Sequence, residues 1–235
     1  MIKLNSIEKV YETGGGRFTA LSVNLEIAKG EFAVVTGCSG SGKSTLLNIL
    51  AGIDRPTSGN IQISGESILC LNESQMSEWR GKTMGIVFQF FQLMSNLSVI
   101  ENVLLPMDLM QKKKNTKSIT DAMRLLEKVG MQNHADKMPS ELSGGEQQRV
   151  AIARSLANQV PILLADEPTG NLDSENSRAI LDLFTSLASE GKTIIMVTHE
   201  QERIKGATRQ IVLKDGIVVA DLDLSAGGDE IGSAH

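Results

Sequence analysis

Residues 31–52 read EFAVVTGCSGSGKSTLLNILAG, in which a short apolar run passes through a glycine-rich turn into a second apolar segment. The turn fits the pattern GxxxxGK[ST] at every fixed position. Glycines at these places let backbone N–H groups turn inward around phosphate oxygens, and the N-terminus of a following helix adds a positive dipole end. The pattern therefore predicts a phosphate-binding loop between a strand and a helix, rather than a glycine-rich turn that binds nothing.

This loop supplies the first set of candidate binding residues, which are Gly37, Cys38, Ser39, Gly40, Ser41, Gly42, Lys43, Ser44 and Thr45. Within the set, Lys43 is expected to reach the β- and γ-phosphates, and the Ser44 hydroxyl is expected to bind Mg²⁺. Cys38 stands at the mouth of the loop beside Lys43. Its thiol is expected to react with maleimide unless a bound nucleotide covers it, and the alternative is an inert small residue.

A second candidate site lies at residues 162–167, ILLADE, where an apolar run ends in two adjacent carboxylates. Successive side chains of a strand point to opposite sides, so Asp166 and Glu167 can have different tasks. We expect Asp166 to hold a metal ion through its water shell and Glu167 to activate an attacking water as general base. The alternative is a solvated pair before a turn formed by Pro168 and Gly170.

The composition is that of a folded protein with an aliphatic core, since 41% of the 235 residues are hydrophobic and only 3% are aromatic. A net charge of −5 disfavours nucleic acid as a partner, because phosphate neutralisation needs clustered basic residues. One basic cluster is interpreted as a solvated helix edge rather than a membrane-surface contact, and it consists of Lys112, Lys113, Lys114 and Lys117. Two cysteines make no disulfide framework, and neither a signal peptide nor a membrane-spanning window is recognisable. We expect a cytoplasmic protein that serves a membrane only through a partner.

Short apolar runs alternate with longer helical patterns, which is typical of an α/β fold with a parallel or mixed sheet. Buried strands, apolar on both faces, are predicted at residues 32–36, 84–88, 161–165 and 193–198. Residues 3–11 and 21–27 alternate instead, which indicates an antiparallel β-flap with a glycine turn at residues 14–16. Residues 210–213 and 217–220 flank a Lys-Asp-Gly turn and predict a final hairpin.

Between residues 89 and 160 the pattern becomes helical, with helices predicted at 99–110 and 118–130. The second helix is expected to end at Gly130 and to bury a stripe made of Ile119, Met123, Leu126 and Val129. We interpret this stretch as a helical insertion between two strands of one sheet. A single domain is therefore expected over residues 1–223, with a core of 1–88 and 161–223, a helical subdomain at about 89–160 and a flexible tail at 224–235.

A third motif lies at residues 142–149, LSGGEQQR, immediately before the helical pattern VAIARSLA. Ser143 fits a helix N-cap and Glu146 fits the reciprocal position of a capping box. That arrangement explains Ser143 and Glu146 but leaves Gly144 and Gly145 without a reason. Exposed amides at a helix N-terminus form an anion site, and two phosphate sites in one chain suggest that they meet across a dimer.

In the content and order of these motifs, residues 1–220 resemble the ATP-binding subunits of ABC transporters. LSGGE matches the family signature, and GCSGSGKST and ILLADE match its two nucleotide motifs. Single positions also match family motifs, namely Gln89 of the Q-loop, Asp173 of the D-loop, the switch histidine His199 and the adenine-stacking aromatic Tyr11. The resemblance implies an ABC ATPase fold, which has a P-loop (RecA-like) core, an antiparallel β-flap and a helical signature subdomain.

The resemblance also implies a mechanism. Two ATP molecules would lie in a head-to-tail homodimer, each between one chain's phosphate loop and the other chain's Ser143, Gly144, Gly145 and Glu146. Glu167 would orient the water that attacks the γ-phosphate, His199 would contact that phosphate, and Ser44 and Gln89 would hold Mg²⁺. Tyr11 would stack on adenine, with a simple covering role on the flap as the alternative.

Within the family, PTGNLD, the glycine turn of the flap and VFQFF with LSVIENVLLP resemble the group that serves lipoprotein release, macrolide export and cell division. The expected partner is a separate transmembrane permease, with the ATPase peripheral on the cytoplasmic face of the inner membrane and export favoured over import. A coupling helix would dock beside residues 89–96, where four apolar side chains either line the groove or belong to the core, namely Phe90, Phe91, Leu93 and Met94. The alternatives are the ATPase of an importer, a soluble ABC-type ATPase, or a regulatory module that binds nucleotide without turnover.

Overall fold

A computed structural model describes residues 1–14, 16–110, 116–199 and 204–225. Three sequence-based expectations therefore fall partly or wholly outside the described residues. They concern Lys112–114 of the basic cluster, Gly15 of the glycine turn and residues 226–235 of the tail.

Within these ranges the chain forms ten strands, which are β1 (Ile2–Thr13), β2 (Gly16–Ile27), β3 (Phe32–Thr36), β4 (Ser58–Ile63), β5 (Glu66–Ser67), β6 (Met84–Val87), β7 (Ile162–Asp166), β8 (Thr193–Thr198), β9 (Arg209–Lys214) and β10 (Ile217–Asp223). The α-helices are α1 (Lys43–Leu50), α2 (Glu73–Thr83), α3 (Val99–Met110), α4 (Thr116–Lys128), α5 (Gly144–Ser155) and α6 (Ser174–Ser189). Short 3₁₀ turns occur at Ile68–Cys70, Gln132–His134 and Pro139–Glu141.

The central sheet has the order β10-β9-β3-β8-β7-β6, and its strands are parallel except for β10. The four predicted buried strands are confirmed as β3, β6, β7 and β8, with ends that agree to within one residue. Every residue of β3 and β8 is buried, because helices or the second sheet cover both faces. The predicted final hairpin is confirmed as β9 and β10. Because the strands are parallel, the ends of β3, β7 and β8 meet at one edge of the sheet.

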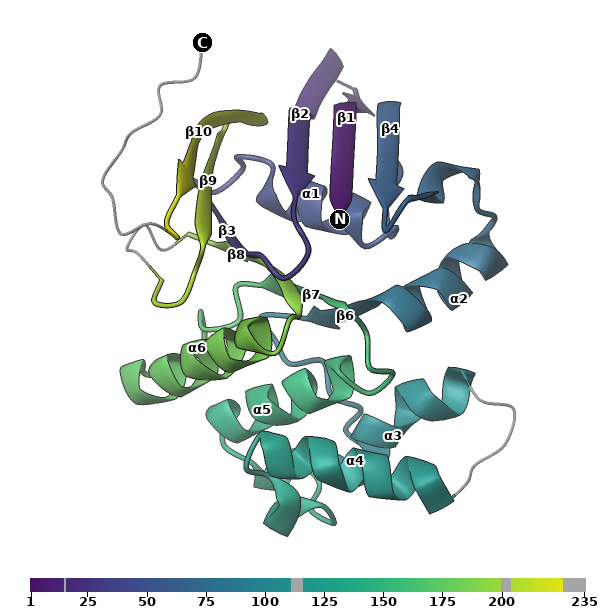
Figure 1. Cartoon of the computed structure of the whole chain (residues 1–235), viewed down its shortest axis with the longest axis vertical. Helices are drawn as coiled ribbons and strands as arrows, with labels where there is room; N and C mark the ends of the chain where they lie inside the picture. Colours follow the sequence, from purple (N-terminus) through teal and green to yellow (C-terminus); the bar gives the residue numbers. More distant parts are fainter. Residues whose placement is uncertain (15, 111–115, 200–203, 226–235) are drawn as a thin grey trace.

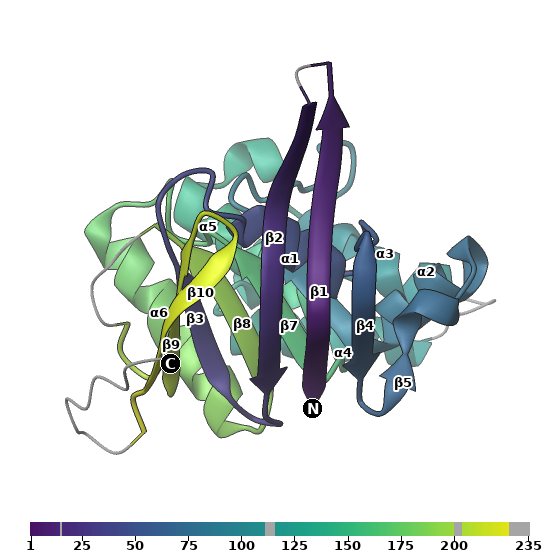
Figure 2. The same ribbon diagram turned by 90° about the horizontal axis from the view of Figure 1, so that it is seen from above.

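A second sheet, in the order β2-β1-β4-β5, forms the predicted antiparallel flap. Figure 2 shows β2, β1 and β4 side by side in front of the central sheet. The β1–β2 turn pairs Thr13 with Gly16, which confirms its predicted place. One core cluster fills the space between the flap, α1 and the central sheet, and it includes Ile7, Leu47 and Ile195. The flap and α1 are thereby fixed against each other, and the phosphate loop lies at their junction (Figure 1).

Helices α3, α4 and α5 lie between β6 and β7 in the chain and pack against one another below the central sheet in Figure 1. A second core cluster joins them to the sheet and to α6. The helix predicted at 99–110 is confirmed as α3. The one predicted at 118–130 is α4, and Gly130 follows it with a left-handed φ of 73°.

The predicted buried stripe of α4 is wrong in part. Ile119 is 52% exposed, and the buried face instead runs through Ser118, Ala122 and Leu126 to Val129. Ala122, Leu126 and Val129 belong to the core cluster that also contains Val103 of α3 and Val150 of α5. The face of α4 that is buried is therefore the one that meets α3 and α5, and it is not the face with the most large apolar side chains.

Candidate nucleotide site

The glycine-rich loop between β3 and α1 has a backbone that only glycine fits at two places. A Cβ at Gly37 would lie 2.2 Å from the Leu213 carbonyl oxygen, and one at Gly42 would lie 2.7 Å from the Ala20 carbonyl oxygen. Both residues have positive φ, at 156° and 99°. The loop is therefore held against β9 on one side and against the flap on the other.

Lys43 runs under this loop and is 7% exposed. Its Nζ donates hydrogen bonds to the carbonyl oxygens of Gly37 at 2.7 Å and Cys38 at 2.9 Å. An ammonium group has three N–H donors, so one remains for a ligand above the loop. Lys43 thus stabilises the fold of the loop and also provides positive charge at its mouth.

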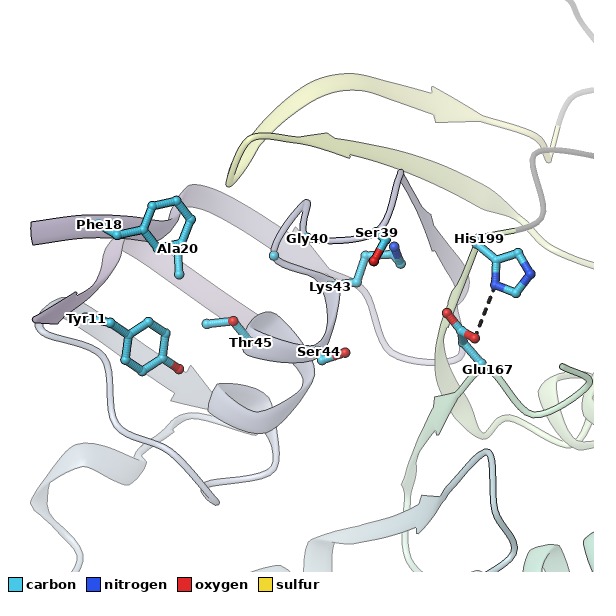
Figure 3. A pocket seen from close by; sticks show the side chains of 11 residues that line it. Tyr11, Phe18, Ala20, Ser39, Gly40, Lys43, Ser44, Thr45, Glu167 and His199 are labelled. Carbon is cyan, nitrogen blue, oxygen red and sulfur yellow. Dashed lines mark ion pairs between the residues drawn. The ribbon is translucent and has the colours of Figure 1, made fainter. Parts of the chain in front are cut away.

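A cleft of about 500 Å³ opens over the loop and brings together most of the predicted nucleotide residues (Figure 3). The residues that line it are Tyr11, Phe18, Ala20, Ser39, Gly40, Gly42, Lys43, Ser44, Thr45, Glu167 and His199. Other predicted residues are not part of this lining, namely Gly37, Cys38, Ser41, Gln89, Asp166, Asp173, Ser143, Gly144, Gly145 and Glu146. The cleft therefore unites the loop, the flap and the ends of β7 and β8, and it excludes the LSGGE motif of the same chain.

Tyr11 and Phe18 form the outer end of the cleft. They are directly paired across β1 and β2, so their rings share one face of the flap, and Phe18 is 57% exposed. The Tyr11 hydroxyl donates to Asp54 Oδ2 at 2.9 Å, and Lys9 Nζ lies 4.9 Å from the ring centroid. Partial burial and the Asp54 carboxylate raise the pKa of Tyr11. The sequence analysis did not identify Phe18, which lies between the glycine turn at 14–16 and the strand predicted at 21–27. The strand β2 begins earlier, at Gly16, and this places Phe18 opposite Tyr11.

Glu167 and His199 follow adjacent parallel strands and face each other at the inner end of the cleft. His199 Nδ1 lies 3.1 Å from Glu167 Oε2 (Figure 3). Glu167 has a left-handed φ of 45°, and its N–H donates to the Val197 carbonyl at 2.9 Å. The turn therefore redirects Glu167 from the line of β7 toward the phosphate loop.

Asp166 and Gln89 stand behind these residues. Burial, the neighbouring Glu167 carboxylate and the opposing Lys43 act on Asp166, and the net result is a raised pKa. A Cβ at Gly170 would lie 3.0 Å from Gln89 Nε2 and 3.6 Å from Glu167 Oε2, so those two side chains converge.

These donors fit Mg²⁺. The ion prefers oxygen ligands and is commonly held by one or two carboxylates together with substrate phosphates. Ser44, Asp166 and Gln89 supply such oxygens, and a dication relieves the cost of a half-buried carboxylate beside another one. The described residues contain no group of three or more His, Cys, Asp and Glu that could form a complete metal cage.

The LSGGE motif forms the predicted capping box at the start of α5. Ser143 N donates to Glu146 Oε2 at 2.7 Å, and Glu146 N donates to Ser143 Oγ at 3.4 Å. A Cβ at Gly145 would lie 2.3 Å from Asn176 Oδ1, whereas the nearest atom to one at Gly144 is Phe91 Cζ at 3.5 Å. Packing within the chain therefore explains Gly145 and does not explain Gly144.

Asp173 caps α6 in this chain. Its Oδ1 accepts from Asn176 N and its Oδ2 accepts from Asn176 Nδ2, both at 2.8 Å. These bonds lower the pKa of Asp173. Asp173 thus fixes the end of the segment that follows Glu167.

The segment after β6 holds two consecutive left-handed residues, Phe91 and Gln92, with φ of 53° and 50°. Their carbonyl oxygens accept from Arg154 of α5, at 2.9 Å from Nη2 and 2.6 Å from Nη1. Burial lowers the pKa of Arg154. Of the four apolar residues predicted here, Leu93 packs on the core, whereas Phe90 and Met94 are 71% and 47% exposed.

The phosphate loop, together with a carboxylate and a histidine at the ends of the adjacent strands β7 and β8, defines a nucleotide-hydrolysing P-loop protein. The separate helix that begins with LSGGE indicates one particular family within this class. The family model described as ABC transporter matches residues 21–170. The chain belongs to this family and is an ATP-hydrolysing cassette of the ABC type, as the sequence resemblance predicted.

Two curated relatives and one solved structure illustrate the match. The lipoprotein-releasing system ATP-binding protein LolD of Aquifex aeolicus is 43% identical over 94% of this chain and 97% of that protein. The macrolide export ATP-binding/permease protein MacB of Chlorobaculum tepidum is 43% identical over 94% of this chain but only 34% of its own length. The dimeric post-hydrolysis structure of the cassette MJ0796 with ADP and Pi has a TM-score of 0.88 and 40% identity, and covers 95% of this chain and 99% of that one. The predicted fold and family group are thereby confirmed. Among the described residues, no helix combines the length and apolar character needed to cross a membrane.

Proposed function

We propose that this chain is the ATP-hydrolysing subunit of an export-type ABC transporter and works as a homodimer with ATP between its subunits. One observation carries the proposal. The cleft contains the phosphate loop, Glu167 and His199, but the Ser143–Glu146 helix start lies outside it, and no close contact among the described residues explains its Gly144. A phosphate approaching Gly144 from a second copy supplies the missing reason, because bare amides at a helix N-terminus bind anions.

The residues of the cleft contact different parts of the nucleotide. The flap aromatics contact the base, the loop amides and Lys43 hold the phosphates, and Glu167 lies where the γ-phosphate would end. Water forms a bond to the γ-phosphorus while the bond from that phosphorus to the β–γ bridging oxygen breaks. Glu167 takes the proton of the water, His199 holds Glu167 and the γ-phosphate in place, and ADP and inorganic phosphate leave.

Mg²⁺ would be held by Ser44 and Gln89 directly and by Asp166 through water. Bound there, it would neutralise charge on the β- and γ-phosphates. The converging side chains of Gln89 and Glu167 support the assignment of Gln89 to this group.

The membrane partner is proposed to be a separate permease, with this subunit on the cytoplasmic face. We propose export of a lipoprotein, peptide or drug rather than import, and the names of LolD (lipoprotein release) and MacB (macrolide export) support the first and last of these. A groove of about 1,110 Å³ between α2, β6 and α3 supports docking of an amphipathic helix, because Phe88, Met94 and Leu109 line it and Leu109 is 78% exposed. No role for nucleic acid is proposed.

The Glu167→Gln variant tests the ATPase and the dimer together. We expect it to bind ATP, to form a dimer that persists in light scattering after size-exclusion chromatography, and to hydrolyse at least ~100-fold more slowly than wild type because the water loses its base. Glu66→Gln, on the exposed edge strand β5, is the matched control and should behave as wild type. A Glu167→Gln protein that stays monomeric with ATP would contradict the dimer.

The partner is tested by mild detergent co-purification from native membranes. A membrane subunit with few spans and a large outer domain supports export. A many-span permease with a binding protein makes the subunit part of an importer, and recovery without any membrane protein favours an ABC-type ATPase not coupled to transport.

A further inference from the structure

Gln148 is a fully buried polar residue on the second turn of α5, two residues after Glu146. Its Nε2 donates a hydrogen bond of 2.8 Å to the carbonyl oxygen of Pro168. Its Oε1 is also buried and has no hydrogen-bond partner among the described residues. A buried amide with one unsatisfied atom costs stability. If the only role of this position were packing, an apolar side chain would fill it better than glutamine.

The hydrogen bond from Gln148 is made to the turn that carries Glu167. Glu167 is left-handed at φ 45°, a conformation that costs a non-glycine residue about 1–2 kcal/mol. Its N–H is held by the Val197 carbonyl, and its own carbonyl accepts from Gly170 N at 3.1 Å. The next carbonyl along the chain, that of Pro168, is fixed from outside the turn by Gln148. The placement of Glu167 thus depends on one main-chain bond from β8, on the Gly170 bond within the turn, on the ion pair with His199 and, through Pro168, on one side chain from α5.

Neighbours of Gln148 on α5 contact the same segment further along. Gly145 packs against Asn176, and Arg149 Nη2 lies 3.5 Å from Asn176 Oδ1. Asn176 in turn is bound by Asp173. The first turns of α5 are therefore attached to the segment after Glu167 at its beginning, through Pro168, and at its end, through Asn176.

We propose that Gln148 is a positioning residue for Glu167, which transmits the placement of the signature helix to the catalytic carboxylate of the same chain. The proposal rests on the proposed function, which assigns Glu167 to the attacking water and the start of α5 to the nucleotide of the second copy. It adds that the helix contacting one nucleotide sets the geometry of the base acting on the other. Hydrolysis at the two sites of the dimer is coupled by this bond.

The test replaces Gln148 by Met, which has a similar shape and cannot donate to the Pro168 carbonyl. We expect kcat for ATP to fall roughly 10- to 100-fold, because small displacements of a catalytic group cost that much, while KM changes less than about threefold. The ATP-dependent dimer should still form and should persist longer than that of wild type. In a Glu167→Gln background, Gln148→Met should lower kcat no further, because Gln148 acts through Glu167.

Asn158→Leu is the matched control, since Asn158 Nδ2 also donates to a proline carbonyl, that of Pro106 at 3.3 Å, away from Glu167. It should lose a comparable amount of thermal stability and keep kcat. If Gln148→Met folds poorly, Gln148→Asn, shorter by one methylene, should give the same kcat loss.

Two results would overturn the inference. One is wild-type kcat in folded Gln148→Met or Gln148→Asn, and the other is a kcat loss that simply follows lost stability in both Gln148→Met and Asn158→Leu. If instead Glu167→Gln itself hydrolyses ATP like wild type, the role of Glu167 in the proposed function is wrong, which is a separate outcome.

Discussion

Alanine substitutions at Gly144 and at Gly145 distinguish a glycine that the fold requires from one that the proposed function requires. The two positions are adjacent on α5, yet a Cβ at Gly145 would lie 2.3 Å from Asn176 Oδ1, while at Gly144 the nearest atom is 3.5 Å away. Asn176 cannot swing aside without cost, because its Nδ2 donates to Asp173 and its Oδ1 accepts from Arg149. Gly145→Ala therefore forces a strained contact or breaks a capping network, and Gly144→Ala does neither.

The net change in the free energy of unfolding can be estimated for both variants. Overpacking costs about 1–3 kcal/mol, and the higher helix propensity of alanine returns up to about 1 kcal/mol. Because both variants gain the same helix propensity, Gly145→Ala should be less stable than Gly144→Ala by about 1–3 kcal/mol, and at about 2–4 °C per kcal/mol for a chain of this size its Tm should lie about 2–12 °C below that of Gly144→Ala. Gly144→Ala should keep or slightly raise its Tm, since it gains propensity without a clash.

In the functional assay, Gly144→Ala is the variant that should show the large effect. Gly144→Ala places a methyl group where the phosphate of the second copy's nucleotide is proposed to lie, so ATP-dependent dimerisation should be lost in a well-folded protein. Thermal unfolding by circular dichroism and light scattering with ATP measure the two quantities. A Gly144→Ala protein that is as destabilised as Gly145→Ala, or one that dimerises like wild type, would refute the reasoning.

Three further predictions follow from the cleft and the capping box. Tyr11→Ala should weaken ATP binding by roughly 5- to 100-fold, the value of one base–aromatic contact, as measured by fluorescence titration, and Ile53→Ala, exposed outside the cleft, should leave it unchanged. Cys38 is exposed, so it should be labelled by maleimide, and saturating ATP should slow the labelling; equal rates with and without ATP would contradict this. The Ser143 bonds hold the pKa of Glu146 below its usual 4.5, so Glu146 stabilises the fold above that pH and loses this contribution as the pH falls through its folded-state pKa. Acid unfolding should therefore be less steep in Glu146→Gln, and an unchanged profile would show that the capping box carries no such linkage.

Much of the central sheet follows from the sequence because buried parallel strands are continuous apolar runs with little ambiguity. The structure puts β3 and β8 at the predicted residues. The glycine loop after β3 is also where it was predicted, but Gly37 and Gly42 are required by close contacts with β9 and the flap, which the motif does not specify. The proximity of the motif residues at strand ends could also be predicted, because parallel strands bring their carboxyl ends to one edge of the sheet.

Other elements could not be predicted from local pattern. Helix α2 has a largely polar sequence with only Met76 and Trp79 buried, so it lacks the apolar period that marks a helix, and its start depends on an Asn72–Gln75 capping box. The buried face of α4 is set by its packing in one cluster with α3 and α5, which the local pattern does not contain. Gln148 looks like an ordinary polar helix residue in the sequence, and its contact with Pro168 exists only once β7 and α5 are packed.

The two left-handed residues after β6 put backbone strain into this segment. Phe91 and Gln92 together cost roughly 2–4 kcal/mol, and the two bonds from the Arg154 guanidinium, each worth about 1.5–3 kcal/mol, offset that cost. The bonds from Arg154 therefore hold the segment in a backbone conformation that non-glycine residues disfavour. Gln89 lies two residues before Phe91, so Arg154 of α5 also fixes the stretch of chain that follows Gln89.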